Sequence, residues 1–270
     1  MEKIVLVTGS TDGIGRETAR QLLRKGYRVI LHGRSEGRCM EVEKYFSDMG
    51  FAPAGCVVGD LASFSSVKMM ASEITSRFSE IDVLINNAGI FNPRYEVTVD
   101  GFEKTLQVNH LSHFLLTYLL FDLVKKKGGR IINVSSMAHA SSVDFGNINA
   151  EKYYDPYEAY SVSKLCNILF TFFLAPKVKK YGVTVNALHP GVINTKLLVA
   201  GWGRIGSSVE KGAETSVYLA TSEEVADVTG EYFVNRRIAK AAKIAYDYDV
   251  QKRCWDLSEK FTGVRWIDKF

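Results

Sequence analysis

The chain has 270 residues, of which 46% are hydrophobic and 24% charged, a balance typical of a globular protein. Its 34 basic and 30 acidic residues are spread along the chain and give a net charge of +4, which argues against nucleic-acid binding. No apolar stretch reaches about 18 residues and no leader pattern opens the chain, so we expect no membrane span and a cytoplasmic location.

Neither the cysteines nor the histidines form a metal-binding pattern. Four cysteines lie far apart without a C-x-x-C pair, and we expect them to be reduced and mostly buried: Cys39, Cys56, Cys166 and Cys254. Packing or hydrogen-bonding roles are expected for the five histidines, His32, His110, His113, His139 and His189. The sequence therefore predicts no metal site.

Short apolar segments alternate with longer amphipathic ones in chain order. The apolar segments span residues 4–8, 28–32, 55–59, 83–87, 130–135, 184–189 and 232–234. Segments that are apolar on both faces and separated by helix-length stretches indicate a parallel sheet buried between two helical layers. The sequence predicts one domain, residues 1–270, with a doubly wound Rossmann α/β fold, a parallel sheet of about seven strands and helices on both faces. Residues 192–212 are predicted to form a flexible substrate loop.

The first predicted strand runs directly into the turn TGSTDGIG, residues 8–15. Gly9 permits a tight turn, Gly13 lets the backbone approach a pyrophosphate, and Gly15 allows close packing of helix and strand. The spacing differs from the G-x-G-x-x-G dinucleotide fingerprint, and a purely structural turn is the alternative. A strand before the turn and a helix after it favour a cofactor site.

The end of the second predicted strand indicates which cofactor binds. An acidic residue there holds the ribose 2′-hydroxyl of NAD, whereas an arginine accommodates the 2′-phosphate of NADP. Here Gly33 stands at the acidic position, Arg34 follows it, and Arg16 lies just past the glycine turn. These two cations favour NADP(H) over NAD(H), because arginine can form paired, charge-assisted bonds with phosphate. The alternative is that both arginines are only solvated.

Five further segments resemble the short-chain dehydrogenase/reductase family in their order and spacing. They are NNAG (86–89), VNHLSHF (108–114), NVSS (133–136), YSVSK (160–164) and HPGVINT (189–195). Within the family, VNHLSHFLLT, IINVSSMAH and SKLCNILF are most similar to the retinol-dehydrogenase-like, NADP-using branch. The resemblance covers nearly the whole chain, so we expect an oxidoreductase.

The resemblance extends the predicted cofactor site beyond the glycine turn. It places Asp60 beside the adenine, the NNAG segment along the cofactor groove, and Pro190 and Gly191 beside the nicotinamide, with Thr195 bonded to its carboxamide. The predicted cofactor-binding residues are Gly9, Ser10, Thr11, Gly13, Ile14, Gly15, Arg16, Arg34, Asp60, Leu61, Asn87, Ala88, Gly89, Tyr160, Lys164, Pro190, Gly191 and Thr195.

Tyr160 and Lys164 are the central candidates for catalysis. Reduction of a carbonyl needs a hydride for carbon and a proton for oxygen, and the protein has to give the proton. A tyrosine with a pKa of about 10 is a poor acid near neutrality, so we expect its pKa to be lowered. Lys164, one helical turn after Tyr160, can supply a stabilising charge. Tyr248 and Lys252 have the same spacing, but no serine-bearing strand precedes them, and we expect a surface pair.

The resemblance adds Ser136 and Asn109 to the predicted catalytic residues. Ser136 matches the residue that binds the substrate oxygen, while its neighbour Ser135 should point to the opposite face of the strand. Asn109 matches the residue that holds a bend and a water leading to the lysine. A helix-capping serine and a locally bonded asparagine are the alternatives.

Two helical segments, residues 114–121 and 166–174, are apolar around most of their circumference. A second subunit could cover their outer faces, as in a homodimer or homotetramer, and the family commonly uses these helices in this way. Pro176 should kink or end the second helix near Leu174, which would alter that interface.

The chain is thus expected to be an alcohol dehydrogenase or carbonyl reductase that acts on a small aldehyde, ketone or secondary alcohol. Leu197, Leu198 and Trp202 could form an apolar wall of the substrate pocket, and Tyr153, Tyr154 or Tyr157 could line it. A catalytically idle NADP-binding sensor or scaffold is the alternative. A sugar-nucleotide epimerase would need a larger region after Thr195.

Overall fold

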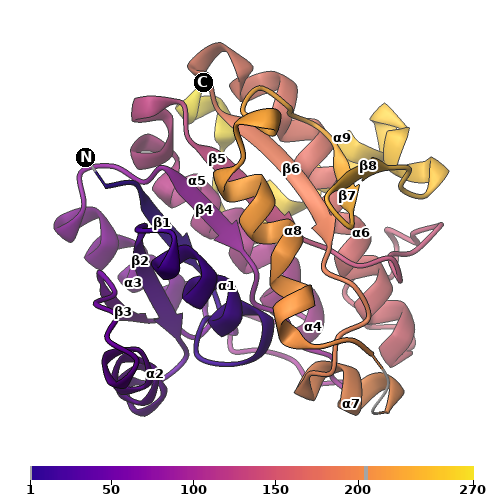
Figure 1. Cartoon of the computed structure of the whole chain (residues 1–270). Helices are drawn as coiled ribbons and strands as arrows, with labels where there is room; N and C mark the ends of the chain where they lie inside the picture. Colours follow the sequence, from indigo (N-terminus) through magenta and orange to yellow (C-terminus); the bar gives the residue numbers. More distant parts are fainter. Residues whose placement is uncertain (1, 204–205) are drawn as a thin grey trace.

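The computed structural model describes residues 2–203 and 206–270, and its centre is an eight-stranded sheet in the order β3-β2-β1-β4-β5-β6-β7-β8 (Figure 1). The strands are β1 (Ile4–Val7), β2 (Arg28–Gly33), β3 (Gly55–Val58), β4 (Val83–Asn86), β5 (Arg130–Val134), β6 (Thr184–His189), β7 (Tyr232–Val234) and β8 (Arg237–Ala239). The first seven strands are parallel and match the seven predicted segments. Strand β8 was not predicted, and it pairs with β7 antiparallel at the edge. The doubly wound α/β prediction is confirmed.

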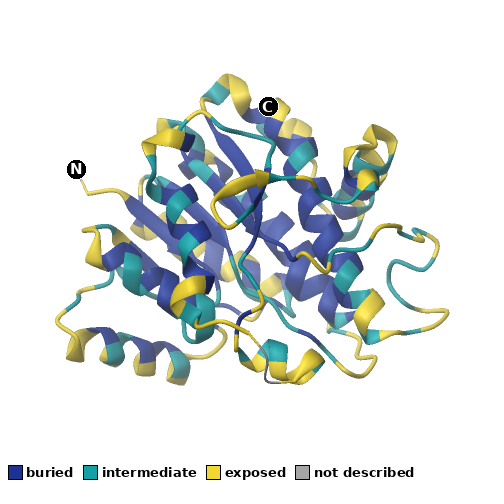
Figure 2. Cartoon of the chain, turned by 45° about the vertical axis from the view of Figure 1, so that its right-hand side comes forward, coloured by how far each residue is buried: buried dark blue, intermediate teal, exposed yellow. Residues whose placement is uncertain are grey.

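One face of the sheet is covered by α1 (Gly13–Arg24), α2 (Glu36–Asp48) and α8 (Val209–Thr221). Their apolar sides pack on strand residues such as Val5, Leu31 and Ile132 and form one continuous core. Each of these helices also has an exposed side, visible as yellow stripes in Figure 2. This one-sided burial explains their amphipathic sequences.

The opposite face is covered by α3 (Phe64–Arg77), α5 (Ser112–Val124) and α6 (Pro156–Val178). A short helix, α4 (Lys104–Leu106), and a π-helical turn, Gln107–Leu111, lead into α5. Short 3₁₀ turns lie at Lys125–Lys127, Lys179–Tyr181, Glu223–Val225, Lys243–Tyr246 and Trp266–Lys269. The sheet therefore lies between two helical layers, with the carboxyl ends of seven strands along one edge.

The outer faces of α5 and α6 are covered by the carboxyl-terminal segment of the same chain. Helix α9 (Tyr248–Thr262) packs along α6, and the ring of its Trp255 lies 5.2 Å from that of Phe114 and 4.9 Å from that of Phe173. Trp266 is fully buried, with its ring centroid 5.4 Å from Phe121. The chain itself thus covers much of the faces for which a second subunit was expected, and the homodimer or homotetramer stays a prediction.

Helix α6 runs past the proline that was expected to end it. Pro176 lies inside the helix, which continues to Val178, so the predicted end near Leu174 is wrong. With its 3₁₀ extension to Tyr181, α6 is long and apolar enough to cross a membrane, but 78% of its most apolar window is buried inside the fold. Among the described residues, no other helix passes that test of length and hydropathy.

Two of the four cysteines are joined rather than reduced. Cys39 of α2 and Cys56 of β3 form a disulfide, with their Cα atoms 5.5 Å apart. The prediction fails for this pair because the fold places α2 directly beside β3. Cys166 and Cys254 are free and buried, as predicted.

The predicted flexible loop at 192–212 contains regular structure. Helix α7 (Lys196–Trp202) lies within it, α8 begins at Val209, and Ile193 forms an isolated parallel bridge with Ser207. Residues 204 and 205 of this segment lie outside the described residues. The mobility of the segment stays a prediction.

Candidate active site

A cavity of about 1160 Å³ opens where the parallel strands end. Its size exceeds the range of about 300 to 1,000 Å³ usual for small ligands, so it has room for a dinucleotide and a substrate. Nearly all of the predicted site residues line it. The two that do not are Ser10 and Asn109.

Ser10 is buried under the turn, and its hydroxyl accepts a hydrogen bond of 2.8 Å from the backbone N–H of His32. The side chain of Ser10 thus fixes the turn to β2, and its predicted contact with the cofactor stays a prediction. The spacing within the turn gave no sign of which residues point inward.

The glycine turn is built from close backbone contacts. Gly9 has φ +65°, and a side chain there would press on the Cα of Ala88, 3.0 Å away. A Cβ on Gly15 would clash with the carbonyl oxygen of Gly9. Gly13, with φ +52°, has only the methyl group of Thr195 within 4 Å of a built Cβ. The turn thus leaves an open cradle at the amino terminus of α1, where free N–H groups favour a pyrophosphate.

His32 connects three strand ends beneath this cradle. Its Nδ1 accepts a hydrogen bond of 2.8 Å from the N–H of Gly9, and its Nε2 donates one of 2.8 Å to the carbonyl of Gly59. Burial lowers the pKa of His32, which keeps the ring neutral and fits this pattern of one acceptor and one donor. The predicted hydrogen-bonding role of His32 is confirmed.

Three arginines line the end of the cavity beside β2. Arg34 follows Gly33, Arg16 stacks on Tyr45 with its guanidinium 4.7 Å from the ring centroid, and Arg38 lines the same end from α2. Arg38, in the first turn of α2 and four residues after Arg34, was missed by the sequence reasoning. Arg16, Arg34 and Arg38 together form an arginine corner, whose positive charge suits a phosphate group.

Helix α7, whose residues line one side of the cavity, is called the lid helix here. It is joined to the glycine turn by an ion pair. Thr195 caps α7 by accepting a bond of 3.2 Å from Leu198 N–H, and Lys196 forms an ion pair of 2.5 Å with Asp12, the N-cap of α1. The ammonium group of Lys196 lowers the pKa of Asp12. This pairing was not predicted, because α7 is remote from α1 in the sequence.

Ser136, Tyr160 and Lys164 meet on the substrate side of the cavity. Tyr160 and Lys164 lie one turn apart on α6, and the Lys164 ammonium is 5.7 Å from the Tyr160 ring centroid. Lys164 Nζ also donates a bond of 3.1 Å to the carbonyl of Val134 at the end of β5. Ser135 also lines the cavity, but its hydroxyl donates a 2.6 Å bond to the Lys164 carbonyl and so is not free to bind the substrate oxygen.

Burial is the main cause of the shifted pKa values of Tyr160 and Lys164. It raises the pKa of Tyr160 to about 12, although a hydrogen bond with Ser136 acts in the opposite direction. It lowers the pKa of Lys164 to about 8. The predicted lowering of the Tyr160 pKa is therefore wrong for the chain alone, because desolvation of the phenolate outweighs the neighbouring groups.

Asn109 lies behind the cavity, inside the π-helical turn Gln107–Leu111. Its Oδ1 accepts a bond of 2.8 Å from Ile90 N–H, and its Nδ2 donates bonds of 3.0 Å to the Ile90 carbonyl and to Ser163 Oγ. The predicted bend is confirmed, since π-helical turns widen a helix locally. The predicted water relay stays a prediction.

Aromatic side chains surround the outer face of Tyr160. Phe91, Tyr157 and Trp202 pack on one another with ring centroids 5.2 to 5.4 Å apart, and Trp202 lies 5.4 Å from Tyr160. The Tyr157 hydroxyl donates a 2.5 Å bond to Gly201 of α7. Phe91 and Trp202 line the cavity together with the predicted residues Leu197 and Leu198 and form an apolar wall, whereas Tyr157 packs behind these two rings and, like Tyr154, does not line the cavity.

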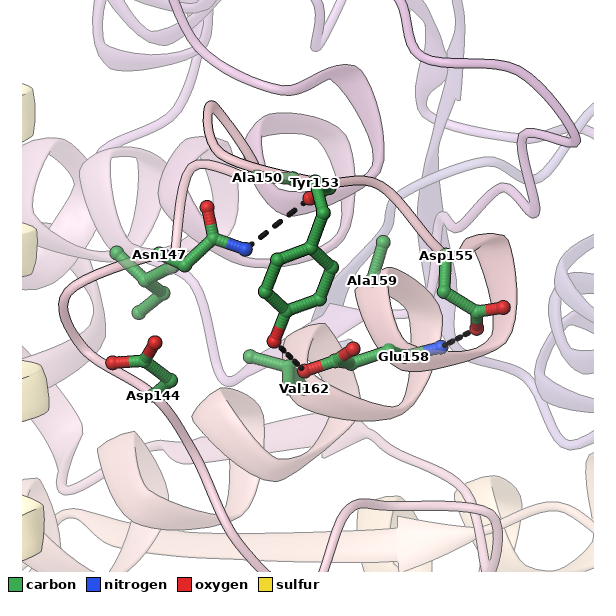
Figure 3. A pocket seen from close by; sticks show the side chains of 9 residues that line it. Asp144, Asn147, Ala150, Tyr153, Asp155, Glu158, Ala159 and Val162 are labelled. Atoms are coloured by element: carbon green, nitrogen blue, oxygen red, sulfur yellow. Dashed lines mark hydrogen bonds between the residues drawn. The ribbon is translucent and has the colours of Figure 1, made fainter.

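A second pocket, of about 20 Å³, lies outside the large cavity, between the loop after β5 and the start of α6 (Figure 3). Tyr153 crosses it and donates a bond of 3.1 Å to Glu158, while Asn147 donates one of 3.2 Å to the Tyr153 carbonyl. Tyr153 thus points away from the substrate side. These bonds hold the first turn of α6, which carries Tyr160.

The second tyrosine–lysine pair lies on the surface, as predicted. Tyr248 is 61% exposed at the start of α9, and Lys252 forms an ion pair of 2.5 Å with Asp256. Neither residue lines a described pocket. Spacing alone therefore does not identify a catalytic pair.

Both the fold and the arrangement of the cavity are those of a nucleotide-binding oxidoreductase. The sequence model of the family described as short chain dehydrogenase matches residues 3–201. The chain belongs to the short-chain dehydrogenase family, and within it is retinol-dehydrogenase-like. It is 40% identical to Retinol dehydrogenase 14 from Homo sapiens, with 97% of this chain and 87% of that protein covered.

Solved structures agree with this assignment. A crystal structure of a putative uncharacterized protein from Mycobacterium paratuberculosis has a TM-score of 0.82 and 31% identity, covering 97% of this chain and 94% of that one. A putative NAD(P)-dependent gluconate 5-dehydrogenase from Beutenbergia cavernae, crystallised with bound NADP, has a TM-score of 0.71 and 29% identity, with 86% and 94% covered.

Proposed function

We propose that the chain is an NADP(H)-dependent oxidoreductase of the alcohol dehydrogenase or carbonyl reductase type. The observation that carries this proposal is the meeting of Ser136, Tyr160 and Lys164 in one cavity with the open glycine cradle. A bound nicotinamide supplies or takes the hydride. The residues of the chain bind the cofactor, orient the substrate and transfer the proton.

The cradle and the arginine corner are the proposed binding site for the cofactor. The cradle at Gly13 would take the pyrophosphate, and Arg16, Arg34 and Arg38 would hold the 2′-phosphate. This cationic corner supports a preference for NADP(H). The bound NADP of the Beutenbergia cavernae protein supports the same cofactor class.

Tyr160 is the proposed general acid and base. In the direction of reduction, its hydroxyl would give a proton to the substrate oxygen while Ser136 Oγ donates a hydrogen bond to that oxygen. The Lys164 ammonium, held by the Val134 carbonyl, stabilises the phenolate that remains. Asn109 positions this group through its bonds to Ile90 and Ser163.

The apolar wall supports a carbonyl or alcohol with a hydrophobic body as substrate. Phe91 and Trp202 offer flat apolar surface in the cavity beside the Tyr160 ring. A soluble aldehyde, ketone or secondary alcohol fits this wall. Retinol, the substrate named for the human relative, is included in the test panel.

The proposal is tested by fluorescence titration with NADPH and NADH, followed by absorbance assays with aldehydes, ketones and retinol. We expect tighter NADPH binding and NADPH-dependent turnover of at least one carbonyl. Binding of NADPH without turnover of any compound in the panel would favour the alternative function, a catalytically idle NADP-binding sensor or scaffold. Tighter binding of NADH would contradict the role of the arginine corner.

A further inference from the structure

His113 of α5 is a buried histidine that no step of the proposed reaction uses. Its Nδ1 lies 3.1 Å from the carbonyl oxygen of Asn109, and its Nε2 lies 3.0 Å from the hydroxyl of Thr8, the residue after β1. His113, Thr8 and Asn109 are all buried, and none of them lines the large cavity. The ring therefore bonds two segments that lie behind the cavity wall.

The partners of His113 determine which ring nitrogen carries the hydrogen. The Asn109 carbonyl can only accept a hydrogen bond, so Nδ1 donates to it and Nε2 is left as an acceptor. Burial lowers the pKa of His113 to about 3, so the ring is neutral near pH 7 and keeps one donor and one acceptor. The hydroxyl of Thr8 is therefore the donor in its bond with Nε2.

The Thr8 hydroxyl oxygen also accepts two backbone hydrogen bonds. They come from the N–H groups of Asn87, at 2.8 Å, and Ala88, at 3.0 Å, which are the middle residues of the NNAG segment. A hydroxyl has two lone pairs and one hydrogen, so these bonds occupy the oxygen and leave the hydrogen for His113. The carbonyl of Ile85 is the more distant acceptor, at 3.4 Å.

These bonds form a continuous path from the cofactor groove to the π-helical turn. The path runs from the NNAG amides through Thr8 and the His113 ring to the carbonyl of Asn109. It joins the ends of β1 and β4, which are neighbours in the sheet (Figure 1), to the start of α5. Each polar atom of the path has one role, so the bonds fix the relative positions of these segments.

Both ends of the path contact the proposed site. Ala88 lies against the glycine turn, because a Cβ on Gly9 would be 3.0 Å from the Cα of Ala88. Gly89 follows Ala88, and a Cβ built on it would lie 3.3 Å from Lys164 Nζ. The same Cβ would lie 3.4 Å from Asn109 Oδ1. A small shift of the NNAG segment would thus change both the cofactor cradle and the surroundings of Lys164.

We propose that His113 is a positioning residue for the reaction. Through Thr8 it fixes the NNAG backbone of the cofactor groove, and through Nδ1 it fixes the turn that carries Asn109. This inference rests on the proposed function and adds to it a residue that lies outside the cavity. The alternative is that His113 contributes to the stability of the fold and to nothing else.

Asparagine and glutamine separate the two bonds of His113. The amide of asparagine reaches about as far as Nδ1, so His113→Asn keeps a donor for the Asn109 carbonyl and loses the bond with Thr8. The amide of glutamine reaches about as far as Nε2, so His113→Gln keeps an acceptor for Thr8 and loses the bond with Asn109. The control is Ser258→Ala, which removes a buried hydroxyl that bonds His110 away from the cavity.

Three quantities are measured for each variant. They are NADPH affinity by fluorescence titration, the single-turnover rate of NADPH oxidation with the carbonyl that the wild type reduces fastest, and the melting temperature. His113→Asn should weaken NADPH binding about fivefold or more and change the rate less than about twofold. His113→Gln should slow the rate about tenfold and change NADPH affinity less than about twofold. Ser258→Ala should change neither.

Thr8 gives a second test of the path, which holds even if a His113 variant fails to fold. Thr8→Val removes the hydroxyl and should weaken NADPH binding at least as much as His113→Asn, whereas Thr8→Ser keeps the hydroxyl and should restore it. In the double variant, His113→Asn should add less than about twofold to the loss caused by Thr8→Val, because the two changes break one path.

Two results would overturn the positioning role. One is an equal loss of NADPH affinity and of rate in His113→Asn and His113→Gln, or a change in melting temperature alone, because a purely structural role does not separate the two. The other is a full additive loss in the double variant. If the wild type reduces no carbonyl of the panel, the proposed function fails, while the NADPH affinities still decide whether His113 positions the cofactor groove.

Discussion

Lys196 at the start of α7 forms an ion pair of 2.5 Å with Asp12, the residue that caps α1 at the glycine turn. The pair joins the lid of the cavity to its cofactor cradle. Lys196 is 84% exposed, and exposed ion pairs contribute little to stability. Its effect should therefore appear in the motion of the lid rather than in unfolding.

Lys196→Met is expected to speed release of NADP(H) by a few fold, about two to five, with the melting temperature unchanged. Stopped-flow displacement measures the release rate. Lys211→Met is the matched control, because Lys211 forms a similar exposed pair with Glu214 away from the cavity. Equal release rates in both variants and the wild type would show that the pair does not hold the lid.

Arg34→Ala is expected to weaken NADPH binding by about tenfold or more and to leave NADH binding nearly unchanged. The reason is the loss of charge-assisted bonds to the 2′-phosphate, which NADH lacks. Fluorescence titration with both cofactors measures the two affinities. Arg24→Ala, at the exposed end of α1, controls for net charge. A parallel loss of NADPH and NADH affinity would place Arg34 outside the phosphate site.

Lys164→Met should make the cofactor-free protein more stable near pH 7, by about 2 kcal/mol, while abolishing activity. Burial lowers the pKa of Lys164 from 10.5 to about 8, so the folded chain holds this charge at a cost. Between pH 8 and 10 the unfolded chain keeps a proton that the folded chain loses, and stability rises with pH. Above pH 10 the raised Tyr160 pKa acts in the opposite direction.

Urea unfolding at several pH values measures this effect as the difference between wild type and variant. The free energy of unfolding should rise between pH 8 and 10 in the wild type and in the control Lys68→Met, which replaces an exposed lysine of α3. This rise should be smaller in Lys164→Met. Identical pH profiles for wild type and Lys164→Met would show that Lys164 is not desolvated in solution.

Trp266→Ala should destabilise the protein by about 3 to 5 kcal/mol, because Trp266 is fully buried among aromatic residues of α5, α6 and α9. Its neighbour Ile267 is 66% exposed, and Ile267→Ala should change the free energy of unfolding by less than about 0.5 kcal/mol. Urea unfolding compares the two. If Trp266→Ala changes the free energy of unfolding as little as Ile267→Ala does, the carboxyl-terminal segment does not cover α5 in solution.

The sequence was sufficient to predict the seven parallel strands, because each is apolar on both faces and bounded by helix-length segments. The strand-end rule located the cradle at Gly13, whereas Ser136 and Tyr160 were predicted from the order and spacing of motifs that resemble the family. Strand β8 has only three residues, and two of them, Arg237 and Ile238, are exposed, so no pattern marked it.

The features that were missed depend on distant parts of the chain. The disulfide of Cys39 with Cys56 requires knowing that α2 lies beside β3. The apolar outer faces of α5 and α6 indicated that something covers them, but not that Trp255 and Trp266 do so. The raised pKa of Tyr160 reflects the burial of its hydroxyl in the folded chain, which spacing does not reveal.

The measurement that tests the central claim most directly is kcat/KM of Tyr160→Phe on a carbonyl that the wild type reduces, with NADPH affinity measured on the same samples. Tyr248→Phe is the control, because Tyr248 stands at the same spacing from a lysine on the surface. We predict that Tyr160→Phe loses about 10²-fold or more in kcat/KM and binds NADPH normally, while Tyr248→Phe matches the wild type. Retention of wild-type turnover by Tyr160→Phe would contradict the assignment of Tyr160 as the proton donor.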